Sequence, residues 1–318
     1  MASPKDFPGL KAPHPSHTGS TAIPLWRPHR APSPPLTTVS ERTKHKIMEK
    51  PLILISNDDG ITAKGITELV RMVSPLGTVI VCAPDGPRSG RSRAFSLTPL
   101  TLTPFSAPQH GGGDVTWYSC NGTPVDCVKM AFALLCPRKP SLVIGGINHG
   151  DNASTNAHYS GTMGIAFEGT IKGVPSVAFS LCDYDADADF RPMEDIVRRV
   201  CRHVLTDGLP KGVCLNVNVP KAGTASDLRG VRICRMAQGG WHNEVEKIEG
   251  DIDESGRQRY ILKGYYRNYE PEAEDTDAWA LANGYVAVTP CTNDMTAYAM
   301  EERLQGIITG QGQDCRLS

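Results

Sequence analysis

The chain has 318 residues, of which 40% are hydrophobic and 21% charged, a composition typical of a globular protein with a sizeable core. Its 33 basic and 34 acidic residues leave a net charge of -1, which gives no support to general binding of nucleic-acid duplexes. No apolar run approaches the roughly 20 residues that a membrane helix requires, so we expect no membrane span.

The N-terminal residues 1–47 differ in composition from the rest of the chain. They contain many prolines, serines and basic residues and show no apolar periodicity, so we expect a disordered extension. A basic, serine-rich start is also found in organellar transit peptides, but a convincing amphipathic helix is missing, and there is no signal-peptide hydrophobic region. Met48 lies shortly before the first expected strand and is an alternative start of the protein or of its mature fold.

The first expected strand, residues 52–55, is a continuous apolar run, as in a parallel strand covered on both faces. Asn57, Asp58 and Asp59 follow it directly, and residues 62–76 show helical spacing of apolar side chains. Two adjacent carboxylates repel each other, which favours a divalent cation with oxygen ligands between or beside them. The alternative is an ordinary turn with a helix cap.

A second strand, residues 78–83, leads into a loop from residue 84 to about residue 98 that is dense in glycine, serine and arginine. The loop offers hydroxyls, backbone amides and the side chains of Arg88, Arg91 and Arg93 to an anionic ligand. A solvated surface loop is an equally good interpretation of its composition. The next strand and helix, residues 117–121 and 122–132, we interpret as structural.

A short strand, residues 141–144, runs into a segment rich in glycine and asparagine, where Asn148 and Asn152 supply neutral oxygens. Three small residues then precede a helix that reaches about residue 171: Ser160, Gly161 and Thr162. Free amides and hydroxyls at a helix N-terminus form a good phosphate site. A simple helix cap is the alternative, but the preceding asparagine- and glycine-rich turn favours a functional role.

Strands at residues 174–180 and 213–219, with a helix at 193–205 between them, complete a pattern of alternating strands and helices. This pattern predicts a Rossmann-like α/β fold with a doubly wound, mostly parallel sheet, over residues 48–222. The pattern changes in residues 223–318, where we expect a projecting β-hairpin at about 241–266 and a C-terminal segment. Aromatic residues on that hairpin suggest subunit contact or burial within their own domain.

The ten cysteines show neither a C-x-x-C pair nor a grouping with histidines at zinc spacing. Several lie in apolar contexts, where a free thiol behaves as a small hydrophobic group. A reducing compartment fits best, so we expect a cytoplasmic protein, with organellar targeting by residues 1–47 as the weaker possibility.

Taken together, these clusters resemble the SurE family, the survival-protein nucleotidases that hydrolyse nucleoside monophosphates. The resemblance covers nearly all of the chain from Met48 to about Leu304 and is carried by motifs in one order: SNDDG at 56–60, APD-x-x-RSG-x-S at 83–92, NGTP-x-D-C at 121–127, GIN-x-G-x-N at 146–152, YSGT at 159–162 and GYVAVTP at 284–290. One departure is Lys64, where the family often has proline.

The resemblance implies one divalent cation per subunit, Mg²⁺ or Mn²⁺, on an all-oxygen set of ligands: Asp58, Asp59, Ser89 and Asn148. It places the substrate phosphate among the metal and a second group of residues: Asn57, Ser92, Asn152, Ser160, Gly161 and Thr162. It also implies a homodimer or homotetramer assembled through the hairpin and the C-terminal segment.

The expected function is therefore metal-dependent hydrolysis of nucleoside 5'- or 3'-monophosphates, with Asp58 and Asp59 as catalytic residues and Asp58 orienting or deprotonating the attacking water. A rival enzyme is an aspartyl-phosphate phosphatase, although such enzymes usually space their acids as D-x-D. A rival of another class is a nucleotide-binding sensor with the same pocket and little turnover. A dinucleotide-dependent oxidoreductase is disfavoured, since no G-x-G-x-x-G follows the first strand.

Overall fold

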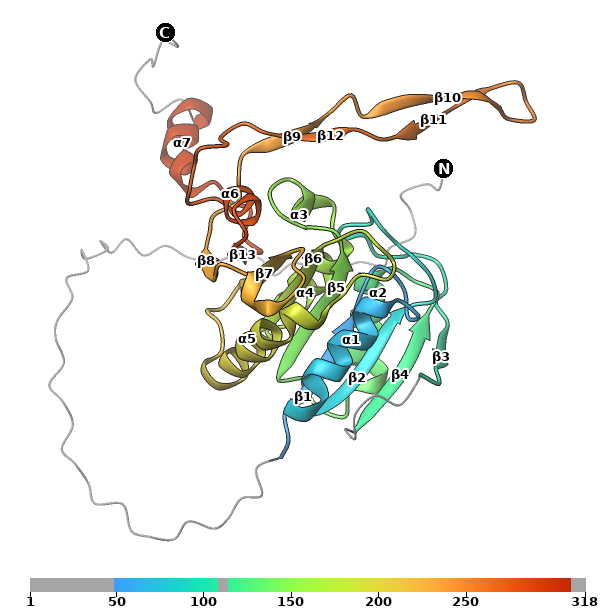
Figure 1. Ribbon diagram of the computed structural model, residues 1–318, viewed down its shortest axis with the longest axis vertical. Coiled ribbons are helices and arrows are strands. Elements are labelled where there is room, and N and C mark those ends of the chain that lie inside the picture. Colours follow the sequence, from blue (N-terminus) through green and yellow to red (C-terminus); the bar gives the residue numbers. More distant parts are fainter. Residues whose placement is uncertain (1–48, 108–113, 310–318) are drawn as a thin grey trace, which may run out of the picture. The chain divides into compact units, whose positions relative to one another are not determined.

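A computed structural model describes residues 49–107 and 114–309; the expected extension 1–47 and the tail from residue 310 lie outside the described residues. Nine strands form the main sheet: β1 (Leu52–Ser56), β2 (Thr78–Pro84), β3 (Leu102–Pro104), β4 (Val115–Cys120), β5 (Leu142–His149), β6 (Ser176–Cys182), β7 (Val213–Pro220), β8 (Val231–Ile233) and β13 (Val286–Thr292). Their order is β3-β4-β2-β1-β5-β6-β7-β13-β8 (Figure 1).

Neighbouring strands from β4 to β7 run parallel, whereas β3 and β13 run antiparallel to β4 and β7. The strand order reverses direction beside β1, which is the point where open α/β sheets bind their ligands. The expected Rossmann-like, mostly parallel fold is thereby confirmed.

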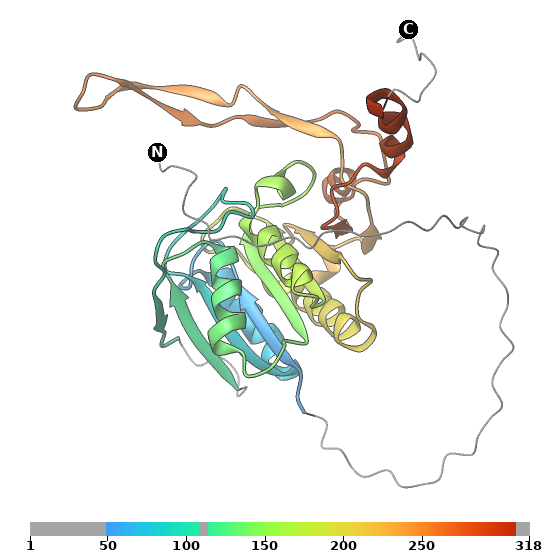
Figure 2. The same ribbon diagram turned by 180° about the vertical axis from the view of Figure 1, so that it is seen from behind.

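Helices cover both faces of this sheet. On one face lie α1 (Lys64–Val73) and α5 (Glu194–Asp207), and on the other lie α2 (Pro124–Met130) and α4 (Gly161–Ile171), as the two opposite views show (Figures 1 and 2). Every residue of β1 is buried, because its side chains alternate between two apolar clusters under these two helix layers. The β1–α1 unit therefore fixes the turn between them firmly against the core.

Most expected elements are present with small shifts of their ends. The apolar residues that predict α1 are all buried, among them Ile66, Leu69 and Val70. Thr123 caps α2 in a capping box with Asp126, as its spacing predicts. The strand β3 and the short helix α3 (Asn156–Tyr159) were not expected.

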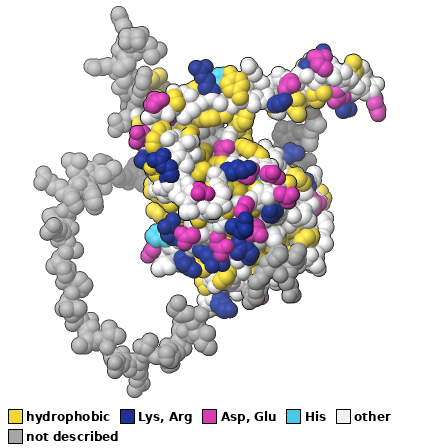
Figure 3. All heavy atoms as spheres, viewed as in Figure 1, with side chains coloured by type: hydrophobic (Ala, Val, Ile, Leu, Met, Phe, Trp, Pro, Cys, Tyr) yellow, Lys and Arg dark blue, Asp and Glu magenta, His cyan; other side chains and the backbone are white. Residues whose placement is uncertain are grey.

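The hairpin consists of two successive two-stranded ribbons, in which β9 (Gly239–His242) pairs with β12 (Tyr265–Asn268) and β10 (Val245–Ile252) pairs with β11 (Gln258–Leu262). Figure 3 shows hydrophobic side chains on its surface among acidic and basic ones. The C-terminal part adds α6 (Asp277–Ala282) and α7 (Glu301–Thr309).

Within the described residues, no helix has the length and apolarity needed to span a membrane.

Candidate active site

The site begins with a tight turn at the end of β1. The side chain of Asn57 closes this turn, because its Nδ2 donates to the Gly60 carbonyl at 2.9 Å and its Oδ1 accepts from the Gly60 amide at 3.2 Å. Gly60 has φ +103°, which favours glycine, and a Cβ there would lie 3.0 Å from the backbone of Gly86. The turn thus presents Asp58 and Asp59 at the carboxyl edge of the sheet, with the loop after β2 packed against it.

Asp58 lies against the N-terminus of α4 and is only 4% exposed. Its Oδ1 accepts a hydrogen bond from Thr162 Oγ1 at 2.5 Å, and its Oδ2 accepts one from the Gly161 amide at 3.2 Å. A Cβ on Gly161 would come within 2.7 Å of the Asp58 Cβ, so this close approach requires glycine. Helix α4 therefore holds the carboxylate in one orientation.

Burial raises the pKa of Asp58 to about 6, and the neighbouring charge of Asp59 acts in the same direction. The hydrogen bonds from Thr162 and Gly161 oppose this shift but do not cancel it. Burial likewise raises the pKa of Asp59. Ionising two adjacent, buried carboxyls is unfavourable. A bound cation offsets this cost, because its positive charge stabilises both ionised forms.

Asp59 connects this turn to the end of β5. Its Oδ2 accepts a hydrogen bond from the backbone amide of His149 at 3.2 Å. The preceding residue, Asn148, donates its Nδ2 to the Gly150 carbonyl at 2.7 Å, which fixes its amide group. Among the described residues no hydrogen bond reaches Asn148 Oδ1, so this neutral oxygen remains open to a ligand.

The loop after β2 carries Ser89, the remaining proposed metal ligand. The Arg88 amide donates to the backbone carbonyl of Asp58 at 2.7 Å, which places the next residue, Ser89, beside the acidic turn with an exposed side chain. The arginines of the loop are partly occupied: Arg88 pairs with Asp85 at 2.7 Å, and the Arg93 guanidinium lies 3.5 Å from the centroid of the Phe167 ring.

The donor set fits a hard divalent cation. The proposed ligands are side-chain oxygens of Asp58, Asp59, Ser89 and Asn148. The first three residues follow β1 and β2 and Asn148 lies at the end of β5, and these strands are neighbours in the sheet. Over residues 49–107 and 114–309, no group of three or more histidine, cysteine, aspartate or glutamate side chains is placed to hold a metal. A zinc site with nitrogen and sulfur ligands is therefore not supported, and two carboxylates completed by neutral oxygens suit Mg²⁺ or Mn²⁺.

The residues expected around the phosphate have partners within the protein. Ser160 Oγ caps α4 by accepting from the Met163 amide at 3.0 Å, and Ser92 Oγ donates to the His158 carbonyl at 2.6 Å. Asn152 is 5% exposed and donates its Nδ2 to Ser180 Oγ at 2.8 Å. These bonds shape the loops around the acidic turn, and direct phosphate contact by these side chains stays a prediction.

Known proteins share the sequence and the fold of this chain. Residues 53–243 match the family model described as survival protein SurE. This chain belongs to the SurE family. It is 53% identical over 258 residues to the 5'-nucleotidase SurE of Phocaeicola vulgatus, covering 81% of this chain and 96% of that protein. It is 47% identical to the 5'-nucleotidase SurE of Bacteroides thetaiotaomicron, with the same two coverages.

A solved SurE structure shares the fold. The crystal structure of the SurE protein from Aquifex aeolicus superimposes with a TM-score of 0.67 at 32% sequence identity, and the match covers 81% of this chain and all of that one. The motifs that carry the resemblance in the sequence thus lie on a SurE fold.

One part of this SurE site was not expected from the sequence: the loop of residues 183–190 after β6. His149 Nδ1 lies 2.9 Å from the carbonyl oxygen of Asp185, and Lys64 Nζ donates to the Asp187 carbonyl at 2.8 Å. Both contacts join backbone carbonyls to residues far away in the sequence, so no local pattern signals them. Lys64, which departs from the usual proline, here anchors the loop beside the acidic turn.

Proposed function

We propose that this chain is a divalent-metal-dependent phosphomonoesterase that hydrolyses nucleoside 5'- or 3'-monophosphates to nucleoside and phosphate. The observation that carries this proposal is the buried Asp58 held by Gly161 and Thr162 of α4, with Asp59 bound to the end of β5. The relatives named 5'-nucleotidase SurE support a nucleotidase and favour the 5'-monophosphates. Metal dependence is a property of the family.

Asp58, Asp59, Ser89 and Asn148 would hold one Mg²⁺ or Mn²⁺ per subunit. When bound there, the cation neutralises charge on the phosphoryl oxygens and lowers the pKa of a water from about 16 toward neutrality. The N-terminus of α4 favours the anionic phosphate through its dipole.

Asp58 orients the attacking water and accepts its proton while the water oxygen bonds to phosphorus and the ester bond to the nucleoside oxygen breaks. The released nucleoside oxygen takes up a proton from solvent, which gives nucleoside and phosphate. Thr162 and Gly161 keep the carboxylate from rotating during this step. Direct attack by Asp58 on phosphorus is the alternative chemistry, and a trapped phosphorylated Asp58 would refute attack by water.

The test is phosphate release by the full chain from a panel of nucleoside 5'- and 3'-monophosphates, with EDTA, Mg²⁺ or Mn²⁺, beside the variant Asp58→Asn. We expect release that depends on metal and falls by at least about 100-fold in Asp58→Asn, because the variant loses a charged ligand and the proton acceptor. The exposed variant Asp275→Asn serves as control and should keep full activity.

A folded, metal-loaded protein that binds nucleotide without releasing phosphate would instead identify a nucleotide-binding sensor. That outcome would show that the pocket is retained without turnover, and it would contradict the enzyme assignment.

We propose further that the chain assembles as a homodimer or homotetramer through the hairpin and C-terminal segment. Support comes from the large side chains exposed on β10 and β11, including Val245, Tyr260 and Leu262, since an isolated two-stranded ribbon is marginally stable in water.

All nine described cysteines are free thiols, which supports our proposal of a reducing, cytoplasmic location.

A further inference from the structure

An exposed aromatic ring lies beside the candidate metal site. Tyr184 follows the end of β6 and is 72% exposed, yet its ring lies against the backbone of Gly150, where an added Cβ would meet the ring at 2.3 Å. Gly150 comes two residues after Asn148, and two residues of chain span at most about 7 Å. The exposed ring therefore stands within the length of a nucleotide from the proposed metal ligands.

The ring is held in place by its hydroxyl. Tyr184 Oη donates to Asp151 Oδ2 at 3.2 Å, and the other oxygen of Asp151 accepts from Asn156 Nδ2 at 3.1 Å. A large aromatic side chain that is mostly in water contributes little to the core. Holding such a ring in one position beside the candidate metal site costs side-chain entropy, and burial in the core does not offset this cost.

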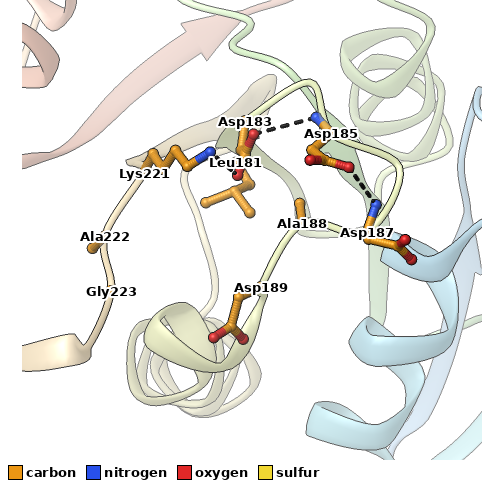
Figure 4. Close-up of a pocket in the computed structure, with 9 residues that line it drawn as sticks. All are labelled: Leu181, Asp183, Asp185, Asp187, Ala188, Asp189, Lys221, Ala222 and Gly223. Carbon is orange, nitrogen blue, oxygen red and sulfur yellow. Dashed lines mark hydrogen bonds and ion pairs between the residues drawn. The ribbon is translucent and has the colours of Figure 1, made fainter.

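The loop that carries the ring is also fixed. Figure 4 shows its acidic residues bracing each other: the amides of Asp185 and Asp187 donate to the carboxylates of Asp183 and Asp185, at 3.2 and 2.9 Å. Asp183 pairs with Lys221 on the neighbouring strand's end at 3.0 Å. Together with the contacts from His149 and Lys64, these bonds hold Tyr184 in one place before any ligand arrives.

Tyr184 forms one wall of a hollow of about 700 Å³, a size within the usual range of about 300–1,000 Å³ for small-molecule sites. Its lining combines aromatic rings with acids and amides, among them Asp151, Asn156, Tyr184, Trp241, Tyr266 and Trp279. Trp241 Nε1 donates to Asn156 Oδ1 at 2.8 Å, which fixes a second ring in the lining of the hollow. Fixed aromatic faces with polar groups between them suit a planar nitrogen heterocycle.

We propose that the base of the nucleoside monophosphate stacks on Tyr184 within this hollow while its phosphate lies at the acidic turn. The proposal rests on the nucleotidase function and deepens it by naming the residue that recognises the base. Because Asp151 already accepts a hydrogen bond from the Tyr184 hydroxyl, the role of Asp151 is to position the ring. A stacking platform accepts every base, but the larger face of a purine gains more contact than that of a pyrimidine.

The experiment compares adenosine 5'-monophosphate with ribose 5-phosphate, which lacks the base, on the full chain with Mg²⁺ or Mn²⁺. In Tyr184→Ala we expect KM for the nucleotide to rise roughly 5- to 100-fold, the range expected for loss of one stacked base, with kcat and ribose 5-phosphate hydrolysis unchanged. Tyr184→Phe keeps the ring and should stay within about threefold of the unchanged protein.

Two further measurements distinguish a base site from a general effect of removing a large exposed side chain. Leu134→Ala removes a large apolar side chain that is 65% exposed, outside both the hollow and the hairpin, and should leave KM for the nucleotide unchanged. Calorimetric binding of adenosine, which requires no turnover, should weaken in Tyr184→Ala by the same factor as KM rises.

The proposal is overturned if Tyr184→Ala changes hydrolysis of both substrates equally, or of neither, while adenosine binds as before. Failure of the nucleotidase function is a separate result, because the unchanged protein would then release phosphate from neither substrate.

Discussion

Asp58 is a buried carboxyl in an environment that disfavours its charge. The chain buries a carboxyl next to a second one and gives it two hydrogen bonds, yet its pKa is still raised to about 6. A protein without a ligand at this place would be better served by a neutral side chain, since an unpaired buried charge is costly. The residue is therefore arranged for a positive partner rather than for the stability of the metal-free fold.

This arrangement predicts how pH acts on the metal-free protein. The folded pKa of Asp58 lies above its ordinary value of 3.8, so its contribution to stability is present below about pH 4 and is lost as pH rises through about 6. With EDTA present, the free energy of unfolding relative to Asp58→Asn should fall by on the order of 3 kcal/mol across this window.

Denaturant unfolding of both proteins from pH 4 to pH 8 measures this difference. Added Mg²⁺ should restore the stability of the unchanged protein above about pH 6 and lose its effect below, because the cation displaces the proton. A difference between the two proteins that stays constant with pH would contradict the prediction.

At the level of elements, one buried acid joins the hairpin region to the catalytic loop. Asp277 at the start of α6 is fully buried and accepts hydrogen bonds at 2.8 Å from the amides of Ser154, Ala237 and Ala278. Ser154 belongs to the loop between β5 and α4, and Ala237 comes just before β9. A displacement of the hairpin base would thus reach the segment that leads into α4.

Replacing this acid should weaken the fold at the junction. Asp277→Ala leaves three amides without their acceptor, and we expect a loss of on the order of 3 kcal/mol in the free energy of unfolding. Asp275→Ala is the matched control: its carboxylate pairs with Arg235 at the surface, so its loss should cost less than about 1 kcal/mol. Denaturant unfolding compares the two variants, and equal losses would contradict the special role of Asp277.

The elements also show which features a sequence reveals. Strands such as β1 were predictable because four of its five residues are buried and apolar, and α1 because its apolar residues share one face. The edge strand β3 has three half-buried or exposed residues ending in Pro104, so it carries no such pattern. The antiparallel direction of β13 was not predictable either, because a strand buried on both faces reads alike in both directions.

The candidate site likewise combines features that the sequence predicts with contacts that only the folded structure reveals. The positions of Asp58, Asp59 and Asn148 at one edge of the sheet were predictable, because the two acids follow β1 and Asn148 lies at the end of β5, where side chains of a parallel sheet meet. The bond from Thr162 to Asp58 joins residues 104 positions apart, and the contact of His149 with the Asp185 carbonyl depends on a loop without regular structure. Such long-range contacts follow from the completed fold and have no local signal.

On the scale of the whole molecule, the hairpin stands out because several of its large hydrophobic side chains are exposed. Ile261 and Leu262 are neighbours on β11 and are 47% and 81% exposed. Since successive residues of a strand point to opposite faces, both faces of the ribbon are apolar in part. Contact with further copies of the chain would cover them.

Charged substitutions on this ribbon should therefore break the assembly. In Ile261→Asp/Leu262→Asp we expect a mass near that of one chain, because two buried carboxylates would oppose the contact. Light scattering measures the mass, and the unchanged protein should be a dimer or tetramer. Glu254→Lys at the turn of the hairpin changes charge without removing apolar surface and should leave the assembly intact. An unchanged mass in the double variant would contradict this role of the ribbon.

The two bonds that orient Asp58 come from residues 103 and 104 positions further along the chain. Between Asp58 and these partners the chain runs through β2, β4 and β5 before it reaches α4. A fragment that ends before α4 would lack both donors and would leave the Asp58 carboxylate without the bonds that orient it.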